Sequence, residues 1–456
     1  MTCKVRLVSA RALTGLAAAA FVIAVLGCSE SSSGDGDGPV TGAEPPPAAE
    51  GAGAEQTESA EPDRDSASAP ADSQDEQSEP APETTTLASS TGADPSPVVI
   101  DFEPIASTPR EDVPSALRDR NHPDHPKPLV DLGQIFSGGP PPDGIPPLED
   151  PAFEPAGEVD WLAGVDPVLA LEINGDARAY PLRIMTWHEL VNGAVGGVPV
   201  TVSYCPLCNS AVAYDRRVGD RILDFGTSGE LFNSALVMYD RQTESLWSHY
   251  TGQAVVGHLT GTELDFIPVQ TVSYESFLAT HPQGHVLSLD TGYSRSYGQN
   301  PYEFYDSSSR PFLLGGPFDD RLEPLTRVLA LRDGGEGAVI PLDALAERRV
   351  VPFSFAGREL VALFEPGTAS ALDRRNIAEG RDVGATGVFV RSVDGRLLDL
   401  SVGAGGGFAD ATTGVVYDIL GQPSDPAGAA LEPVEHLDTF WFAAAAFYPD
   451  IEIIGQ

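Results

Sequence analysis

The sequence predicts a strand-rich α+β fold in which two tandem, degenerate repeats form two similar lobes. Short apolar runs alternate with polar residues along residues 100–456, and the chain contains 47 Gly and 40 Pro. Such alternation is typical of strands with one buried face, and Gly and Pro mark the turns between strands. With 456 residues, 41% of them hydrophobic, the chain is long enough for two hydrophobic cores.

Motifs that occur twice in the same order predict the duplication. Where the first copy has Cys205 and Cys208, the second has Glu365 and Thr368, so we expect the first copy to carry the chemistry. The matched pairs are residues 138–143 with 315–320, 168–171 with 328–331, 200–204 with 360–364, 224–229 with 382–387, and 240–243 with 410–413.

Residues 1–28 have the pattern of a targeting segment. Lys4, Arg6 and Arg11 precede an apolar stretch that is too short and too rich in Ala for a good membrane span. Its end, Val-Leu-Gly before Cys28, resembles a bacterial lipoprotein signal, and the resemblance implies that Cys28 is lipidated. We therefore expect an extracytoplasmic, membrane-anchored lipoprotein, on the outer membrane or cell surface. An ordinary secretory signal is the alternative, and it leads to the same side of the membrane.

Residues 29–98 predict a disordered acidic tether between this anchor and the folded body. The segment is rich in Ser, Gly, Ala, Pro and Glu, and Arg64 is its only basic residue. A chain of this composition buries too little apolar surface to offset the entropy of ordering, and its like charges repel one another. We assign residues 99–308 to the first lobe and residues 309–456 to the second.

The charge of the chain excludes some classes of partner. Its 67 acidic and 27 basic residues give a formal net charge of −40. Nucleic acids and anionic membrane surfaces would be repelled, so we expect contact with the membrane through the lipid anchor only. A small-molecule or metal ligand remains compatible with this charge.

The sequence Cys205-Pro-Leu-Cys208 is the strongest candidate for a chemical site. It follows an alternating run, residues 200–204, that predicts a strand with one buried face. Two thiols in a tight turn can chelate a metal, form a disulfide or exchange disulfides. Outside the cytoplasm such thiols meet oxidising conditions. A single reactive thiol and two plain buried cysteines are further alternatives, and the sequence leaves all of these open.

A histidine precedes this predicted strand on a predicted short helix. Pro181 suits a helix start, and the apolar spacing of residues 183–192 before Gly193 predicts the helix itself. Because the helix leads directly into the strand, His188 is a candidate base or metal ligand beside Cys205. A histidine packed at the edge of the core is the alternative.

Metal binding would require ligands beyond the two thiols. Zinc or iron bound by sulfur takes four ligands, and Cys205 and Cys208 supply two. His188 and His249 are the candidates for the remaining two ligand positions. Met185 and Met238, the methionines of the mature chain, add a weaker alternative, a copper site with Cys, His and Met ligands. For His249, the alternative to metal binding is aromatic packing beside Trp247. The sequence leaves zinc, iron and copper open.

Several motifs together identify a family resemblance. They include residues 187–192 (Trp-His-Glu-Leu-Val-Asn), 204–208 (Tyr-Cys-Pro-Leu-Cys), 225–229 (Phe-Gly-Thr-Ser-Gly) and 239–243 (Tyr-Asp-Arg-Gln-Thr). With the closing aromatic motifs they span about residues 130–456. This set resembles the bacterial and archaeal family catalogued as domain of unknown function 3179. The resemblance implies no established activity, cofactor or substrate.

Two functional hypotheses follow from the sequence. In the first, the protein carries a Cys/His site for metal binding or thiol redox chemistry, with Cys205 central, His188 as base or ligand, and Cys208 as second ligand or resolving thiol. In the second, it is a non-catalytic surface binding or scaffold module with a structural disulfide between the two cysteines. A hydrolase that uses Asp143 and Glu189 is a weaker third possibility, because no spacing rule joins the two carboxylates.

Overall fold

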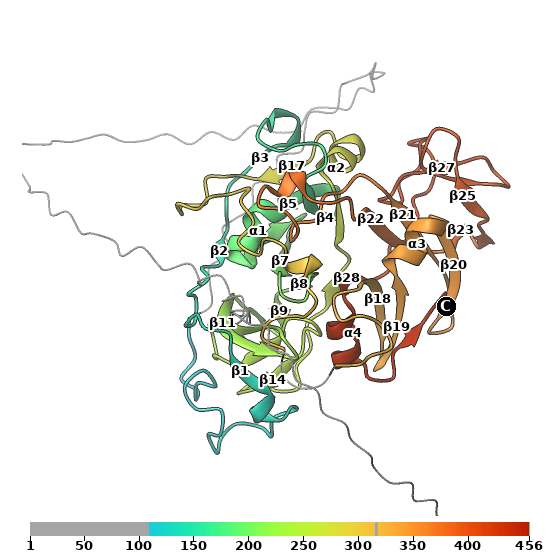
Figure 1. The fold of residues 1–456 in the computed structure, drawn as a ribbon. Helices are drawn as coiled ribbons and strands as arrows, with labels where there is room; N and C mark the ends of the chain where they lie inside the picture. The colour runs from blue at the N-terminus through green and yellow to red at the C-terminus, as the bar shows by residue number, and fades with distance from the viewer. Residues whose placement is uncertain (1–108, 315–317, 456) are drawn as a thin grey trace, which may run out of the picture. The chain divides into compact units, whose positions relative to one another are not determined.

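The computed structural model describes residues 109–455 apart from 315–317 (Figure 1). Its strands far outnumber its helices, which confirms the predicted strand-rich α+β class. The predicted targeting segment, Cys28 and the acidic tether lie outside the described residues. Within them, no helix is long and apolar enough to cross a bilayer. The α-helices are α1 (Leu182–His188), α2 (Tyr274–Thr280), α3 (Leu342–Arg348) and α4 (Trp441–Phe447).

The first half of the described chain forms three larger sheets and a small ribbon, β9 (Arg217–Val218) with β10 (Arg221–Ile222). One sheet has the order β15 (Phe266–Ile267), β8 (Ser210–Asp215), β7 (Val198–Cys205), β6 (Leu190–Val195), β2 (Leu148–Glu149). A second has the order β16 (Gln270–Ser273), β4 (Pro167–Ile173), β5 (Asp176–Pro181), β17 (His285–Leu287), β3 (Phe153–Pro155). The third has the order β1 (Ile135–Ser137), β11 (Phe225–Phe232), β12 (Ala235–Asp240), β13 (Leu246–Ser248), β14 (Ala254–Val256).

The second half forms smaller sheets and another ribbon, β23 (Ser392–Val393) with β24 (Arg396–Leu397). One sheet has the order β28 (Leu437–Phe440), β18 (Arg327–Asp333), β19 (Glu336–Pro341), β29 (Glu452–Ile453). The others have the orders β20 (Val350–Phe355), β21 (Arg358–Glu365), β22 (Ala385–Val390), and β25 (Leu400–Val402), β26 (Phe408–Asp410), β27 (Val416–Tyr417).

Local sequence accounts for several of these elements. The predicted strand at residues 200–204 is β7, but both of its faces are buried, whereas the alternation predicted one buried face. Gly175 between two apolar runs predicts a turn, and this turn joins β4 to β5, where both Asn174 (φ 53°) and Gly175 (φ 82°) have the positive φ that a tight hairpin turn requires. The sequence also predicts helices around Phe277 and over residues 440–447, and these are α2 and α4.

The helix predicted over residues 183–192 ends earlier than expected, at His188. Glu189 caps it in the left-handed conformation (φ 59°), and its backbone N–H donates to the carbonyl oxygen of Met185. The chain then enters β6, which pairs antiparallel with β7. Pairing with β7 therefore overrides the helical spacing of the apolar residues.

The glycines of residues 226–229 predict a turn, but the segment is part of β11. The ladder between β11 and β12 shifts between Thr227 and Glu230, which marks a β-bulge. Gly229 has φ 75°, and a Cβ there would overlap the carbonyl oxygen of Pro140. The glycine thus serves a bulge and a close backbone approach.

The predicted hairpin of β12 and β13 is confirmed, and a buried carboxylate holds its turn. Asp240 accepts hydrogen bonds from Thr243 N (2.6 Å) and Oγ1 (2.9 Å), Ser245 N (3.2 Å) and Trp247 Nε1 (2.9 Å). All four residues are buried. Loss of the carboxylate would therefore leave several donors without partners.

We expect Asp240→Ala to lower the free energy of unfolding by about 3 kcal/mol or more, because each buried donor left without an acceptor costs about 1–3 kcal/mol. Chemical denaturation of both proteins measures this difference. Asp290→Ala, at an exposed position, is the control and should change little. A loss below about 1 kcal/mol in Asp240→Ala would show that the turn does not depend on this network.

Candidate functional site

The two cysteines lie at the turn between β7 and β8, in the interior of the protein. Cys205 ends β7 and pairs with Ser210, the first residue of β8. Asn209 has positive φ (52°), which lets the chain reverse within the turn. Both cysteines are free thiols, 2% and 0% exposed. The disulfide proposed as an alternative from the sequence is not formed in this structure.

Each thiol has defined polar neighbours. Cys208 Sγ lies 3.0 Å from Ser210 Oγ, and Leu236 N donates to Cys205 Sγ at 3.4 Å. Burial raises the pKa of Cys205 well above its ordinary value, and the hydrogen-bonded thiol of Cys208 raises it further. Cys205 is therefore a neutral thiol at neutral pH, a form that is a weak nucleophile.

His249 is connected to this turn by a hydrogen bond to Ser210, the first residue of β8. Its Nε2 lies 2.9 Å from Ser210 Oγ, and its Nδ1 lies 2.9 Å from Ser203 Oγ. The ring is fully buried, and this burial lowers its pKa to about 3. His249 is therefore neutral at neutral pH, with one nitrogen protonated and the other free to accept a hydrogen bond.

Ser203, His249, Ser210 and Cys208 form a continuous series of hydrogen bonds, and counting donors and acceptors assigns the proton of each bond. A carbonyl oxygen can only accept, so the Ser203 hydroxyl donates to Glu189 O, 2.9 Å away. His249 must then donate to Ser203 through Nδ1–H and accept from Ser210 through Nε2. Ser210, whose proton points to the imidazole, is the nearer acceptor for the Cys208 thiol, at 3.0 Å, and the carbonyl oxygen of Cys205 is a second acceptor at 3.9 Å. The chain thus leads a proton from Cys208 towards His249.

A buried carboxyl group completes the surroundings of Cys205. Glu189 is 6% exposed, and burial, followed by the nearby Cys205 thiol, raises its pKa well above the ordinary value, while a hydrogen bond from Tyr302 opposes the shift. Glu189 is therefore a neutral acid over part of the pH range in which exposed glutamates are ionised. Among the described residues, the site joins two thiols, an acid and an imidazole in an apolar interior.

His188, predicted to act on Cys205, has other partners. Its Nδ1 lies 2.7 Å from the carbonyl oxygen of Pro146, and its Nε2 lies 2.6 Å from the hydroxyl of Tyr297. Both ring nitrogens are thus occupied by groups other than the thiols. The physical reason is the left-handed residue Glu189, which turns the chain between α1 and β6. Burial lowers the pKa of His188 to about 4.

The predicted set of metal ligands does not come together. Among residues 109–314 and 318–455, no group of three or more His, Cys, Asp or Glu side chains is placed to hold a metal ion. Cys205 and Cys208 are neighbours, whereas His249 reaches Cys208 only through Ser210, and His188 belongs to a separate set of contacts. Each imidazole already uses both of its nitrogens, so neither has one to spare for a metal in this arrangement.

The two methionines considered for the copper alternative, Met185 and Met238, lie in different apolar clusters. Met238 packs in the apolar cluster that contains both cysteines. Met185, on α1, packs in a different cluster together with Tyr204 and Val202.

Sequence reasoning missed Ser203 and Ser210, which connect His249 to the cysteine turn. A usable signal was present for both. Ser203 precedes Cys205 by two residues, so alternation along β7 places both side chains on one face of the sheet. Ser210 lies opposite Cys205 once the segment is read as a hairpin.

Asp143 and Asp224 lie in or beside glycine-rich stretches, which makes them sequence candidates for polar groups around a pocket, but each forms an ion pair instead. Asp143 Oδ2 accepts from the Tyr239 hydroxyl (2.6 Å) and from Arg241 Nη1 (2.8 Å). Asp224 pairs with Arg216, whose side chain is only 2% exposed. These contacts hold β11 and β12 to the preceding loops, which is a structural role.

Comparison with known proteins identifies the family of this chain but assigns no activity to it. A family model described as "Protein of unknown function (DUF3179)" matches residues 142–451, which is more than half of the chain. No curated protein and no solved structure matches the chain. The match confirms the resemblance drawn from the motifs.

We expect Glu189→Gln to gain stability relative to the wild type as the pH rises from 5 to 8. The pKa of Glu189 is higher in the folded state than in the unfolded state, where it is about 4.3. The favourable contribution of wild-type Glu189 to the free energy of unfolding is therefore fully present below the unfolded-state pKa, and it is lost as the pH rises through the folded-state pKa. The difference should change by at least about 1.4 kcal/mol in denaturation measurements. Glu303→Gln, at an exposed position, is the control. Parallel pH profiles of Glu189→Gln and wild type would contradict the assignment of a neutral Glu189.

Proposed function

Because the chain belongs to the DUF3179 family of proteins of unknown function, its activity has to be argued from geometry, and we propose that Cys205 and Cys208 form a redox-labile dithiol. The observation that carries this proposal is the hydrogen-bonded chain from Cys208 through Ser210 to His249. A purely structural pair of buried cysteines does not require a connected proton acceptor.

The proposed reaction is thiol–disulfide exchange with a low-molecular-weight disulfide. Cys208 loses its proton through Ser210 to His249, and the thiolate attacks one sulfur of the oxidant to form a mixed disulfide. The other sulfur of the oxidant leaves as a thiolate and takes up a proton. Cys205 then loses its proton and displaces the second thiol. The protein gains one disulfide, and the oxidant gains two electrons and two protons. These roles reverse those expected from the sequence, since the proton acceptor lies beside Cys208.

Burial makes this reaction slow in the closed protein. Both thiols are almost inaccessible, the pKa of Cys205 is raised and that of His249 is lowered to about 3, so the closed state favours neutral groups. The Tyr305 hydroxyl donates to Leu207 O (2.7 Å) and covers the turn. Oxidation therefore requires local opening, and the reduced dithiol is kinetically protected.

The scaffold hypothesis is the second candidate, and the same burial favours it. In that case the thiols remain reduced and packed, and the two halves serve to build a surface. Bound metal is the third alternative, and stoichiometric zinc that is lost in Cys205→Ser would support it over the redox proposal.

We further propose that the body arose by duplication. β4, β5, α1, β6 and β7 recur as β18, β19, α3, β20 and β21, with each boundary shifted by 160 residues. The left-handed residue after the helix also recurs, at Glu189 (φ 59°) and Arg349 (φ 65°). In the first half, β16 pairs antiparallel with β4, α2 follows, and β17 pairs parallel with β5. In the second half, β28 pairs antiparallel with β18, α4 follows, and β29 pairs parallel with β19. This agreement in order and register supports common descent of the two halves.

One of the matched sequence pairs is not supported by the backbone hydrogen bonds. Arg216 and Arg391 each accept a backbone hydrogen bond from the leucine seven residues later. The residue after that leucine is Asp224 in the first half and Asp399 in the second. These contacts favour Asp399, rather than Asp382, as the counterpart of Asp224.

The location of the protein is also a proposal. The targeting pattern of residues 1–28 supports a lipoprotein anchored through Cys28 on the extracytoplasmic side, where disulfides persist. We propose that the lipid is its only contact with the membrane, because the acidic chain repels anionic headgroups.

We expect the native wild type to form one intramolecular disulfide when it is incubated with oxidised glutathione, detected by mass spectrometry after alkylation. Cys205→Ser should instead retain a mixed disulfide at Cys208. His249→Gln should slow the reaction about tenfold or more, since general-base assistance is typically worth 10²–10⁴-fold. Thiols that resist the oxidant in the native protein and react only in urea would overturn the proposal and leave the scaffold hypothesis.

We expect Cys28→Ser in the full chain to move the protein from the membrane fraction to the soluble extracytoplasmic fraction, because the lipid would have no attachment site. Fractionation followed by immunoblotting measures this, and Cys3→Ser is the matched control. Unchanged membrane association of Cys28→Ser would contradict the lipoprotein prediction.

A further inference from the structure

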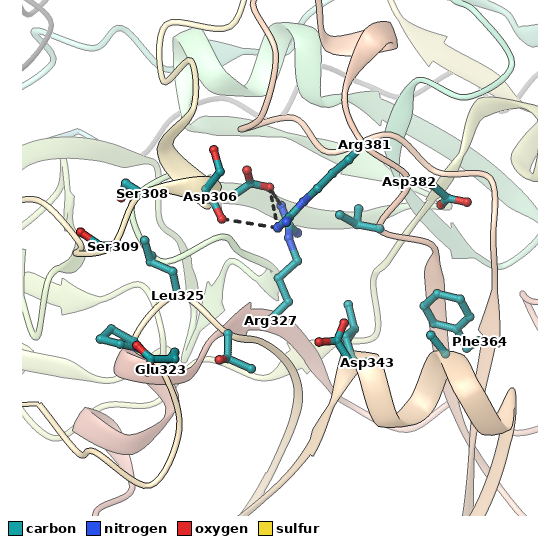
Figure 2. A pocket seen from close by; sticks show the side chains of 16 residues that line it. Asp306, Ser308, Ser309, Glu323, Leu325, Arg327, Asp343, Phe364, Arg381 and Asp382 are labelled. Atoms are coloured by element: carbon teal, nitrogen blue, oxygen red, sulfur yellow. Dashed lines mark hydrogen bonds and ion pairs between the residues drawn. The ribbon is translucent and has the colours of Figure 1, made fainter.

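A cavity of about 420 Å³ lies in the second half of the chain, beside the start of β18 and the helix α3 (Figure 2). Its volume falls in the range of small-molecule sites. Figure 2 shows the guanidinium groups of Arg327 and Arg381 converging on Asp306 at one end of this cavity. Neither the dithiol nor His249 lines it.

Asp306 is the buried centre of this arrangement. Its side chain is 0% exposed, and its Oδ2 accepts from Ser370 Oγ (2.5 Å) and Arg327 Nη2 (2.9 Å), with Arg381 Nη2 at 3.4 Å. Its other oxygen, Oδ1, and the Nε of Arg327 are buried with no hydrogen-bond partner among the described residues. Such unpaired buried atoms cost stability, so the network is incomplete as a purely structural device.

The inner end of the cavity favours a single negative charge. Two guanidinium groups face one carboxylate there, which leaves an excess of one positive charge. Arg381 is only partly committed, because its side chain is 48% exposed and its contacts to Asp306 use Nη2 alone. A ligand carboxylate matches the planar fork of donors that an arginine presents.

The outer part of the cavity has the opposite preference. Glu323, Asp343 and Asp382 are exposed carboxylates on its lining, and none of them forms an ion pair within the part of the chain that the structure describes. They would repel a multiply charged anion and attract an ammonium group. Leu325 and Phe364 add apolar surface to the lining, Leu325 on the side of Glu323 and Phe364 on the side of Asp382 (Figure 2). A bound metal ion is a poor match, since no metal-ligating group of three side chains occurs among the described residues.

We propose that this cavity binds a small zwitterion, an α-amino acid with an apolar side chain. The ligand carboxylate lies against Arg327 and Arg381, and its ammonium group faces Asp343. The side chain packs on Leu325, which lies on the other side of Arg327 from Asp343 (Figure 2). This assignment does not depend on the dithiol proposal, because it concerns a different set of residues.

Matched ligands test each charge separately in calorimetric titrations of the full chain. Leucine and phenylalanine should bind saturably, whereas leucinamide, which lacks the carboxylate, and 4-methylpentanoate, which lacks the amine, should each bind about tenfold or more weakly than leucine. Inorganic phosphate should not compete. No binding of either amino acid at about 10 mM, equal affinity of both analogues and leucine, or preferential binding of phosphate would overturn the proposal.

Matched variants locate the binding in this cavity. Arg381→Ala should weaken leucine binding about tenfold or more, and Asp343→Asn should weaken leucine without affecting 4-methylpentanoate. Arg374→Ala removes an exposed arginine outside the cavity and should leave the affinity unchanged. Circular dichroism of each variant establishes that it is folded. Equal leucine affinity in folded Arg381→Ala and wild type would place the binding elsewhere and reject the assignment.

Discussion

The hydrogen bonds of His249 are the constraint on which the cysteine site depends. The ring joins Ser203 on β7 to Ser210 on β8, its backbone N–H donates to Leu236 O, and its carbonyl oxygen accepts from the Tyr214 hydroxyl. All of these groups lie in an apolar interior, where a polar atom without a partner is costly. The imidazole therefore fixes the positions of both strands and of the thiol beside Ser210.

The second half of the chain closes over this site. Cys208 O accepts from Phe440 N (3.0 Å) and from Thr439 Oγ1 (2.8 Å), both at the end of β28. The Tyr305 hydroxyl donates to Leu207 O, and the next residue, Asp306, lines the cavity between Arg327 and Arg381. The cysteine turn and the cavity thus lie against the same short segment. Opening of the turn would require this segment or β28 to move.

The position equivalent to Cys205 has a different use in the second half. Glu365 ends β21 as Cys205 ends β7, and its Oε1 accepts from the Ser276 hydroxyl on α2 (2.8 Å). At this position the second half thus has a contact to α2 instead of a thiol. Pairing of β21 with its neighbours needs only the backbone and the alternating apolar side chains, so the strand does not require a cysteine there.

The sequence by itself determined the strand at residues 200–204, the turn at Gly175 and the hairpin around Asp240. These features depend on alternation and turn chemistry within a few residues. Tertiary structure alone decided that α1 ends at His188, that His249 rather than His188 is hydrogen-bonded to Ser210 beside the cysteine turn, and that a cavity forms around Asp306. The partners in those cases are far apart in sequence, and their meeting depends on how the sheets pack, which no local pattern encodes.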